Sequence, residues 1–367
     1  MNLLIHSSRA SYYIGGTEVV SLHQTIGLAR RGHYITYLVR KAEQDSPYYH
    51  DFKKTIAAEA LPVHIREVAL YDTPYGNGHS WPIWHQESQA FTDAAQEHIH
   101  DAISAGVDLT VAHLSTDSLS MPSSAPHLLH LHGSPLATDP LMDRSMEKPQ
   151  HTVAHSSSIH DWWSSRYPNV PMDVFRNGVP IDEFFQPVDA PRPIDILYVG
   201  RFLEHKGITD ILDAATPDQS LVIAGRGEFR TELERRIRDK GLRAEIIDNP
   251  SNELLVALYK QAKVFACPSR AKEGVLTTML EASAAGCAIV TATGSGMTDL
   301  AVDNHNSRLI APQDVDSLQK IFDELLSDDT KRMKLAETMQ ETVCREWSWE
   351  HKAEQLESIY AHASSRS

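Results

Sequence analysis

The sequence predicts an α/β protein built from two doubly wound domains, each with a parallel sheet. Short β-branched runs alternate with amphipathic stretches along the whole chain, and this alternation is typical of strands covered by helices on both faces. The pattern stops once, at residues 186–193, where three prolines fall within seven residues. Because prolines at that density cannot continue a helix or a central strand, this segment is a linker. A length of 367 residues also suits two domains.

The expected elements follow directly from this alternation. Long amphipathic patterns predict helices over residues 18–31 and 251–261 and from Trp349 to about Ser364. The linker divides the chain into a domain of residues 1–188, a domain of residues 189–348 and a final helical segment of residues 349–367. The expected strands are residues 3–7, 35–39, 63–68, 109–113, 127–132, 152–155 and 173–176 before the linker, and 196–200, 221–224, 245–248, 264–266, 288–291 and 308–310 after it.

The charge of the chain limits its partners. The formal net charge is −15, with 34 basic against 49 acidic residues. Such a chain lacks the basic surface that nucleic-acid binding requires. It also disfavours a tight grip on anionic lipid, although a peripheral membrane contact through a local patch stays open. An anionic ligand must therefore be held by a few placed cations.

The chain is also predicted to be cytoplasmic. No apolar run approaches the roughly 18 residues that cross a bilayer, and the first residues lack the basic region of a signal peptide. The cysteines at 267, 287 and 344 form no CxxC pair, which is typical of free thiols in a reducing compartment.

The densest candidate site is the segment 268–282, which follows the strand 264–266 and opens a helix. Backbone N–H groups at a helix start attract anions. Here they fall at about Val275 to Thr278. Gly274, Val275, Leu276 and Thr277 are therefore predicted to bind the donor.

Two carboxylates flank this helix start. Glu273 precedes the helix, and Glu281 lies eight residues later, close to two and a quarter turns, so both can face one ligand. Carboxylates accept hydrogen bonds from sugar hydroxyls without a counter-charge. The alternative, in which Glu273 only partners the helix dipole and Glu281 is a surface residue, remains open.

Cations that could neutralise phosphate follow the first strand of the second domain. Arg201 can donate two parallel hydrogen bonds to phosphate oxygens, and Lys206 can add a point charge. The alternative is an ordinary solvated loop. Gly225, in a Gly-x-Gly turn, and Asn249, after another strand, are predicted to lie near the nucleotide; Gly225 can equally serve only close packing.

The first domain offers two further candidates. Gly15 and Gly16 open the first predicted helix with a bare backbone that a phosphate or sugar can approach, although Thr17 can also act there as a simple helix cap. His130 and His132 share one face of a strand, but no Asp or Glu lies at a useful spacing, so no metal is expected. Sixteen of the 20 histidines precede Asp189, and the sequence offers no account of that bias.

The segment 71–85 is predicted to be a Gly/Pro loop carrying four large aromatic residues. Because aromatic faces stack on sugar rings, Tyr75, Trp81 and Trp84 are candidate acceptor-binding residues. A loop that packs its own aromatics is the equal alternative.

Several of these segments resemble the retaining glycosyltransferases of family GT4, which have the GT-B fold of two Rossmann-like domains facing a cleft. The resemblance rests on Gly-Gly-Thr-Glu at 15–18, His-Gly at 132–133, Gly-Arg with Lys-Gly at 200–207, and Glu-Gly-x-Leu-Thr-Thr-x-Leu-Glu at 273–281. It covers most of the chain and implies that the last helix packs back on the first domain. Two departures are Leu276, where the family has glycine or proline, and Val275, where an aromatic is common.

The resemblance also implies roles for individual residues. Glu273 would hold the hydroxyls of the donor sugar, Glu281 the ribose, and His132 would lie beside the donor sugar. Arg201 and Lys206 would neutralise the leaving diphosphate, which makes a metal ion or cofactor unnecessary.

The implied function is transfer of a sugar, with retention, from a nucleotide-diphosphate sugar to a carbohydrate-containing or small-molecule acceptor, with a UDP-sugar as the expected donor. The alternatives are a non-catalytic sugar-nucleotide-binding protein and a sugar-nucleotide epimerase on the same fold. An epimerase would need acid and base residues around the sugar, which the sequence does not offer.

Overall fold

The computed structural model describes residues 1–76, 81–119, 121, 124–134, 140–271 and 273–365, without the side chains of Trp81, Pro82 and Leu141. Its contacts divide the chain into two compact units. Unit 1 comprises Met1–Asn177 together with Trp349–Ser367, and unit 2 comprises Gly178–Ser348. This division falls at Asn177, whereas the sequence placed the domain boundary at Val188, in the proline-rich segment.

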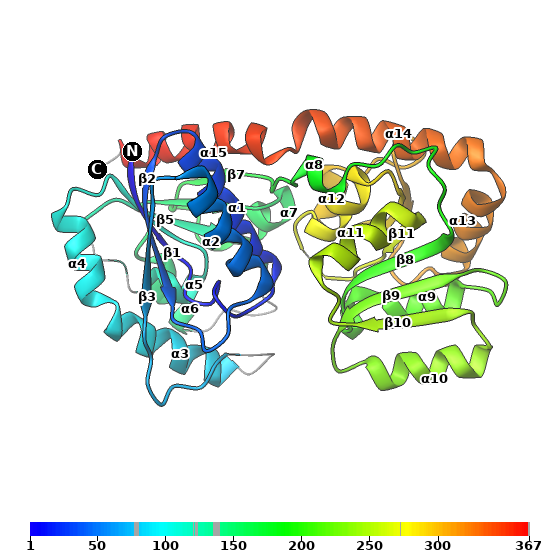
Figure 1. Ribbon diagram of the computed structural model, residues 1–367, viewed down its shortest axis with the longest axis horizontal. Coiled ribbons are helices and arrows are strands. Elements are labelled where there is room, and N and C mark those ends of the chain that lie inside the picture. The colour runs from blue at the N-terminus through cyan, green and yellow to red at the C-terminus, as the bar shows by residue number, and fades with distance from the viewer. Residues whose placement is uncertain (77–80, 120, 122–123, 135–139, 272, 366–367) are drawn as a thin grey trace. The chain divides into compact units, whose positions relative to one another are not determined.

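Unit 1 is built on a seven-stranded parallel sheet in the order β3-β2-β1-β4-β5-β6-β7 (Figure 1). The direction of strand progression reverses between β1 and β4, which pair in register from Leu3 with Leu109 to His6 with Ala112. The strands are β1 (Asn2–His6), β2 (Tyr34–Arg40), β3 (Val63–Val68), β4 (Leu109–Ala112), β5 (His127–Leu131), β6 (His151–Ala154) and β7 (Met172–Val174).

Helices cover both faces of this sheet because successive side chains of each strand point to opposite sides. Leu3 and Ile5 pack with α1, α2 and the carboxyl-terminal α15, whereas Leu4 packs with α3 and α4, and α6 and α7 cover the end of β5. The helices are α1 (Gly16–Arg30), α2 (Pro47–Glu59), α3 (Trp81–Ala94), α4 (Gln96–Ser104), α5 (Ser115–Ser118), α6 (Pro140–Met146), α7 (Ser157–Arg166) and α15 (Trp349–Ser364).

Unit 2 has a six-stranded parallel sheet in the order β10-β9-β8-β11-β12-β13, which reverses between β8 and β11. Helices α8, α11 and α12 pack on one face, helices α9, α10 and α13 pack on the other, and α14 contributes to both cores. The elements are α8 (Ile181–Phe184), β8 (Ile194–Arg201), the 3-10 turn η1 (Glu204–Lys206), α9 (Ile208–Ala214), β9 (Leu221–Arg226), α10 (Arg230–Lys240), β10 (Ala244–Asp248), α11 (Asn252–Gln261), β11 (Ala262–Cys267), α12 (Thr277–Ala284), β12 (Ala288–Ala292), η2 (Gly296–Asp299), β13 (Arg308–Ile310), α13 (Val315–Ser327) and α14 (Asp329–Glu346).

The predicted fold class is confirmed: each expected strand overlaps an observed strand, and both sheets are parallel. Two local predictions are wrong. Residues 81–85 form the first turn of α3, where Pro82 is tolerated because N–H groups of a first turn have no partner within the helix. Thr17 is not the cap of α1, because the helix starts one residue earlier and Gly15 is its N-cap.

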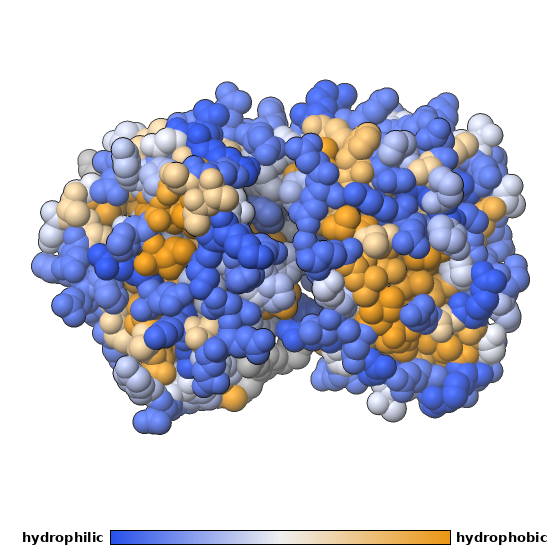
Figure 2. Space-filling view, in the orientation of Figure 1, coloured by the Kyte–Doolittle hydropathy of each residue, from blue (hydrophilic) through white to orange (hydrophobic). Residues whose placement is uncertain are grey.

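In Figure 2 hydrophilic residues surround the visible face of each unit, and a broad apolar area occupies the middle of the visible face of unit 2. Among the described residues, no helix combines the length and apolar character that a bilayer crossing needs.

Candidate functional site

Each sheet has one point where its strand order reverses, and open α/β sheets bind ligands beyond the carboxyl ends of the strands at that point. In unit 2 the reversal lies between β8 and β11. The loop after β8 carries Arg201 and Lys206, and the loop after β11 carries Glu273. In unit 1 the reversal lies between β1 and β4, which are followed by Gly15 and His113. Gly15 and the unit 2 candidates Arg201, Lys206 and Glu273 therefore fall at the expected edge.

The two loops of unit 2 meet through an ion pair. Lys206 Nζ donates to Glu273 Oε1, and Ser269 Oγ donates to the other oxygen, Glu273 Oε2, at 3.0 Å. The loops also pack closely, because a Cβ on Gly207 would lie 2.2 Å from the carbonyl oxygen of Pro268. Gly207 has a φ of +70°, so the backbone after Lys206 can approach the second loop only with glycine at this position.

These contacts keep Glu273 ionised. Burial acts to raise the pKa of this carboxyl, but Lys206 and the Ser269 hydroxyl outweigh burial, so the pKa is lowered from its ordinary value. Both oxygens thus accept hydrogen bonds, and each keeps a lone pair for a hydroxyl of a ligand.

The start of α12 lies four residues after Glu273. Leu276 is the N-cap, with an extended backbone, and no side chain caps the helix. By helix geometry the first N–H groups, those of Thr277 and Thr278, have no partner within the helix, whereas the Met279 N–H donates to the carbonyl of Leu276 at 3.1 Å. Val275 is buried in the core of unit 2, so only its backbone is available, and Gly274 links it to Glu273. This arrangement leaves an uncapped helix start beside the Lys206–Glu273 pair.

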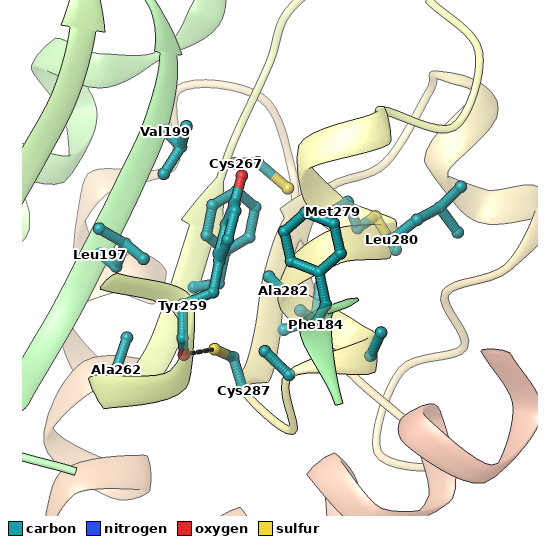
Figure 3. Close-up of a cluster of buried hydrophobic side chains, with 14 of the residues drawn as sticks. Phe184, Leu197, Val199, Tyr259, Ala262, Cys267, Met279, Leu280, Ala282 and Cys287 are labelled. Carbon is teal, nitrogen blue, oxygen red and sulfur yellow. Dashed lines mark hydrogen bonds between the residues drawn. The ribbon is translucent and has the colours of Figure 1, made fainter. Parts of the chain in front are cut away.

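Glu281 is held by a different neighbour. Tyr259, on α11, donates its hydroxyl to Glu281 Oε2 at 2.8 Å. Figure 3 shows the ring of Tyr259 in the core cluster with Phe184 and Met279, so packing fixes the direction of the hydroxyl. Burial raises the pKa of Glu281 to about 7; the Tyr259 hydrogen bond opposes this rise and the charge of Glu183 adds to it.

The remaining unit 2 candidates surround the ends of β8, β9 and β10. Arg201 is exposed at the end of β8, and its carbonyl accepts a hydrogen bond from Tyr198 Oη at 2.8 Å. Asn249 N–H donates to the carbonyl of Gly225 at 3.0 Å. A Cβ on Gly225 would lie 1.9 Å from the carbonyl oxygen of Gly200. Close packing against β8 therefore explains this glycine, the alternative that the sequence left open.

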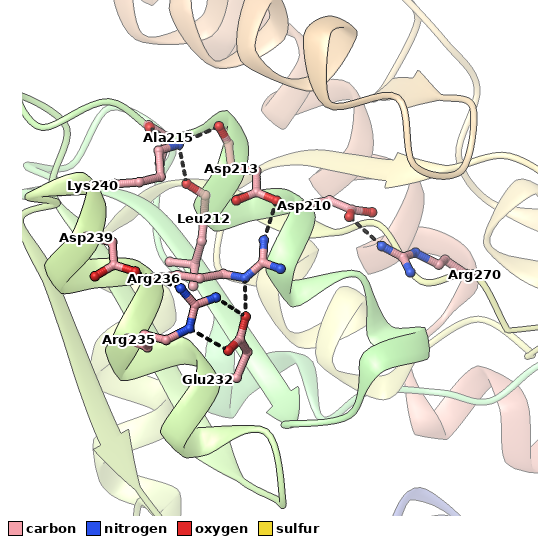
Figure 4. A network of polar contacts seen from close by, with 10 residues as sticks. All are labelled: Asp210, Leu212, Asp213, Ala215, Glu232, Arg235, Arg236, Asp239, Lys240 and Arg270. Carbon is pink, nitrogen blue, oxygen red and sulfur yellow. Dashed lines mark hydrogen bonds and ion pairs between the residues drawn. The ribbon is translucent and has the colours of Figure 1, made fainter.

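A pocket of about 620 Å³ lies nearby, between α9, α10 and the loop that carries Arg270. Arg270 is paired there with Asp210 of α9, and Arg236 with Asp213, as Figure 4 shows. The lining includes the two arginines against the acidic residues Glu204, Asp210, Asp213, Glu228 and Glu232. Since carboxylates outnumber cations, this pocket is unsuited to a diphosphate.

In unit 1, the two glycines before α1 differ in their surroundings. A Cβ on Gly15 would lie 2.5 Å from Glu18 Oε2, whereas a Cβ on Gly16 would meet nothing within 4 Å. Glu18 also faces the buried Arg9, with 3.4 Å between Oε1 and Nη2. The side chains of Glu18 and Tyr13 thus crowd position 15, whereas position 16 is open.

His132 belongs to a cluster of four histidines and one tyrosine at the carboxyl ends of β4, β5 and β6. His113 Nδ1 lies 3.3 Å from His132 Nε2. His130 Nδ1 lies 2.9 Å from His155 Nε2, and His130 Nε2 lies 2.8 Å from the hydroxyl of Tyr360 on α15. Burial lowers the pKa of all four histidines, to about 3 for His155, so the rings are neutral.

Nitrogen atoms of His113, His130 and His132 lie within 4.8 Å of one another, close enough to suggest a metal site. The rings of His113 and His130 are, however, stacked with an interplanar angle of 6° and 4.5 Å between centroids. A metal must lie near the plane of every imidazole that binds it, because the nitrogen lone pair is in that plane. One ion cannot satisfy two parallel stacked rings, so this arrangement does not fit a metal centre.

The predicted acceptor residues contact arginines of their own unit. The guanidinium of Arg9 lies 3.8 Å from the ring centroid of Trp84, and that of Arg40 lies 3.7 Å from the centroid of Tyr75. One face of each ring is therefore covered. The side chain of Trp81 lies outside the described residues, and the acceptor role of all three residues stays a prediction.

Sequence reasoning missed several partners of the site. Ser269 falls inside the segment that drew attention, four residues before Glu273, but its role depends on the loop conformation. Tyr259, His113, His155 and Tyr360 lie far from the motifs in sequence, and only the packing of α11, β4, β6 and α15 brings them to the site.

Comparison with known proteins agrees with this geometry. Residues 181–342 match the family described as Glycosyl transferases group 1. The chain is 29% identical over 152 residues to a GDP-mannose-dependent monoacylated alpha-(1-6)-phosphatidylinositol monomannoside mannosyltransferase from Corynebacterium glutamicum, an alignment that covers 40% of each protein. The chain therefore spans about two fifths of the length of this relative.

Solved structures match over the whole chain. Sucrose-phosphate synthase from Thermosynechococcus elongatus has a TM-score of 0.81 at 16% identity and covers 100% of both chains. Anabaena HepE, solved in complex with UDP and glucose, has a TM-score of 0.76 at 18% identity, covering 99% of this chain and 100% of that one. Residues 181–342 thus match a Glycosyl transferases group 1 domain, and the two parallel-sheet units have the GT-B fold.

Proposed function

We propose that this chain is a retaining, metal-independent glycosyltransferase of family GT4 that uses a nucleoside diphosphate sugar, with UDP as the nucleotide, and a carbohydrate-containing or small-molecule acceptor. The observation that carries the proposal is the junction of Lys206, Glu273 and Ser269 beside the uncapped start of α12. It combines a cation and free N–H groups for phosphate with an ionised carboxylate for sugar hydroxyls.

The residues have distinct proposed roles. Lys206 has three N–H donors, one of which is used by Glu273, so two remain for phosphate oxygens. Arg201 and the N–H groups at Thr277 would add further donors. Charge builds up on the diphosphate as the glycosidic bond breaks, and cations already in place stabilise that charge. Glu273 would bind the sugar and Glu281 the ribose.

The relatives support a nucleotide sugar but differ in nucleotide: one is named as GDP-mannose-dependent, and another was solved with UDP and glucose. A thermal-shift panel of UDP-, GDP- and ADP-sugars separates these donors. A donor at about 100 times its Kd stabilises the folded chain by about 2.7 kcal/mol. A donor that gives such a shift is then tested for hydrolysis and transfer, and the anomeric configuration of the product is read by NMR.

Variants make the test specific to the site. Lys206→Met should abolish the shift, whereas Lys263→Met should keep it, because Lys263 pairs with Asp195 at the opposite edge of the same sheet. If no nucleotide sugar shifts the melting temperature and none is hydrolysed, the proposal is wrong. Binding without hydrolysis or transfer to any acceptor would favour the non-catalytic alternative.

A further inference from the structure

The hydrogen bond between His113 and His132 bears on which ring nitrogen of His132 carries its proton. His113 is buried, with 1% of its surface exposed, and its ring is stacked on His130. Its Nε2 is buried and has no hydrogen-bond partner. The only hydrogen bond of its ring within the described residues is the 3.3 Å contact between Nδ1 and His132 Nε2.

The lack of a partner for His113 Nε2 indicates which of the two rings donates the proton in the hydrogen bond between His113 and His132. A neutral imidazole has one N–H donor and one acceptor nitrogen. If His132 donated to His113, then His113 Nε2 would be a buried N–H without an acceptor. If His113 donates from Nδ1, its Nε2 is instead a bare lone pair. Orphaned buried donors are the rarer case in native structures, which favours donation from His113.

The proton of His132 is then forced to the other side of its ring. Its Nε2 accepts from His113, and burial lowers its pKa well below the ordinary value, so the ring is neutral. The single proton of His132 must therefore lie on Nδ1. The ring cannot turn freely to escape this assignment, because it is stacked on His155 with 3.9 Å between centroids.

We propose that His113 is a positioning residue that holds His132 as the Nδ1–H tautomer, so that His132 presents a hydrogen-bond donor to the ligand. His132 is only half-buried, at the end of β5, and Nδ1 has no hydrogen-bond partner within the described residues. It can donate to a hydroxyl or ring oxygen of a bound sugar, and it cannot act as a general base from that nitrogen. The consequence for the ligand rests on the proposed transferase function, whereas the tautomer does not.

The second hydrogen-bonded chain of the cluster supplies a matched control. The hydroxyl of Tyr360 lies 2.8 Å from His130 Nε2, and His130 Nδ1 lies 2.9 Å from His155 Nε2. Within the described part of the chain, these residues contact the His113–His132 pair by ring stacking. Tyr360→Phe should therefore perturb His130 and leave the tautomer of His132 unchanged.

The test is a long-range ¹H–¹⁵N correlation spectrum of the chain labelled with ¹⁵N-histidine, in which the nitrogen shifts distinguish the two tautomers. The His132 signals are assigned by their loss in His132→Gln. We expect Nδ1–H in the wild type and in Tyr360→Phe. His113→Leu should convert His132 to the Nε2–H form or to a mixture, while His113→Asn should preserve Nδ1–H, because the asparagine amide can place a donor near the former Nδ1.

Activity gives an independent readout. In a transfer assay, His113→Leu should reduce kcat/KM for the donor about 2- to 12-fold, the value of one neutral hydrogen bond, and His113→Asn should restore most of it. An Nε2–H tautomer in the wild type, or an unchanged His132 signal in His113→Leu, overturns the proposal. If the chain proves inactive, the spectrum still decides the tautomer, so failure of the function and failure of the positioning role are distinguishable.

Discussion

Replacing Lys206 by methionine tests whether the loops after β8 and β11 are held together by charge. The substitution removes the cation and leaves Ser269 as the side chain that still donates to the Glu273 carboxylate among the described residues. The exposed fractions of the two side chains are 11% for Lys206 and 21% for Glu273. Exposed ion pairs contribute about 0–1 kcal/mol, and breaking a fully buried pair costs about 3–5 kcal/mol.

The Lys206–Glu273 pair lies between these limits, so we expect Lys206→Met to lower the free energy of unfolding of unit 2 by about 2–3 kcal/mol at pH 7.5. For a unit of this size, that loss lowers the melting temperature by about 4–12 °C. The control is Lys263→Met, which breaks a Lys–Asp pair in the same unit whose lysine is 30% exposed. It should cost less than about 1 kcal/mol.

The pH dependence follows from the sign of the pKa shift. In the wild type the pKa of Glu273 is below its ordinary value of 4.5, so its contribution is present above that pH and is lost as the pH falls through the lowered pKa. Without Lys206, burial dominates and raises the pKa of Glu273, so the ionised carboxylate destabilises the folded state as the pH rises. The difference between wild type and Lys206→Met should therefore be complete near neutrality and should disappear only once the pH has fallen through the lowered pKa of Glu273.

A double-mutant cycle with Glu273→Gln measures the interaction directly. Urea unfolding of the wild type, both single variants and the double variant should give a coupling energy of about 1.5–3 kcal/mol, as expected for a charged hydrogen bond. The reasoning is refuted if the two substitutions are additive within about 0.5 kcal/mol, or if Lys206→Met is no more destabilising than Lys263→Met.

Three other predictions concern the same two units. The folded pKa of Glu281, about 7, exceeds its ordinary value of 4.5, so ionisation of Glu281 destabilises the folded state as the pH rises between those values. Glu281→Gln should therefore raise the free energy of unfolding, measured by urea titration, by about 1–3 kcal/mol at pH 8 and little at pH 4. His155, with a pKa of about 3, binds a proton more readily when unfolded, so the urea midpoint followed by tryptophan fluorescence should fall as the pH drops from 7 to 5, and an unchanged midpoint would contradict neutral buried histidines. Gly225→Ala should destabilise unit 2 by more than about 3 kcal/mol because its Cβ would collide with the carbonyl of Gly200, whereas Gly16→Ala should leave the melting temperature within about 2 °C; equal effects would exclude this packing argument.

The sequence alone determined the architecture of this protein. Strands such as Leu109–Ala112 and Ala288–Ala292 are buried along their whole length, so continuous apolar runs between amphipathic stretches mark them without any tertiary information. It also placed Arg201, Lys206 and Glu273 at one edge, because parallel strands bring the loops after their carboxyl ends together.

Only the tertiary structure decided how those side chains are used. A hydrogen bond forms or fails when the distance between two atoms changes by a few tenths of an ångström. The partners can be far apart in sequence, as Tyr259 and Glu281 or Tyr360 and His130 are. Periodicity carries no information at that scale. The same limit hid the start of α3 at Trp81, where glycines and prolines suggested a loop. It also hid the cluster in which β4, β5 and β6 bring His113, His132 and His155 together.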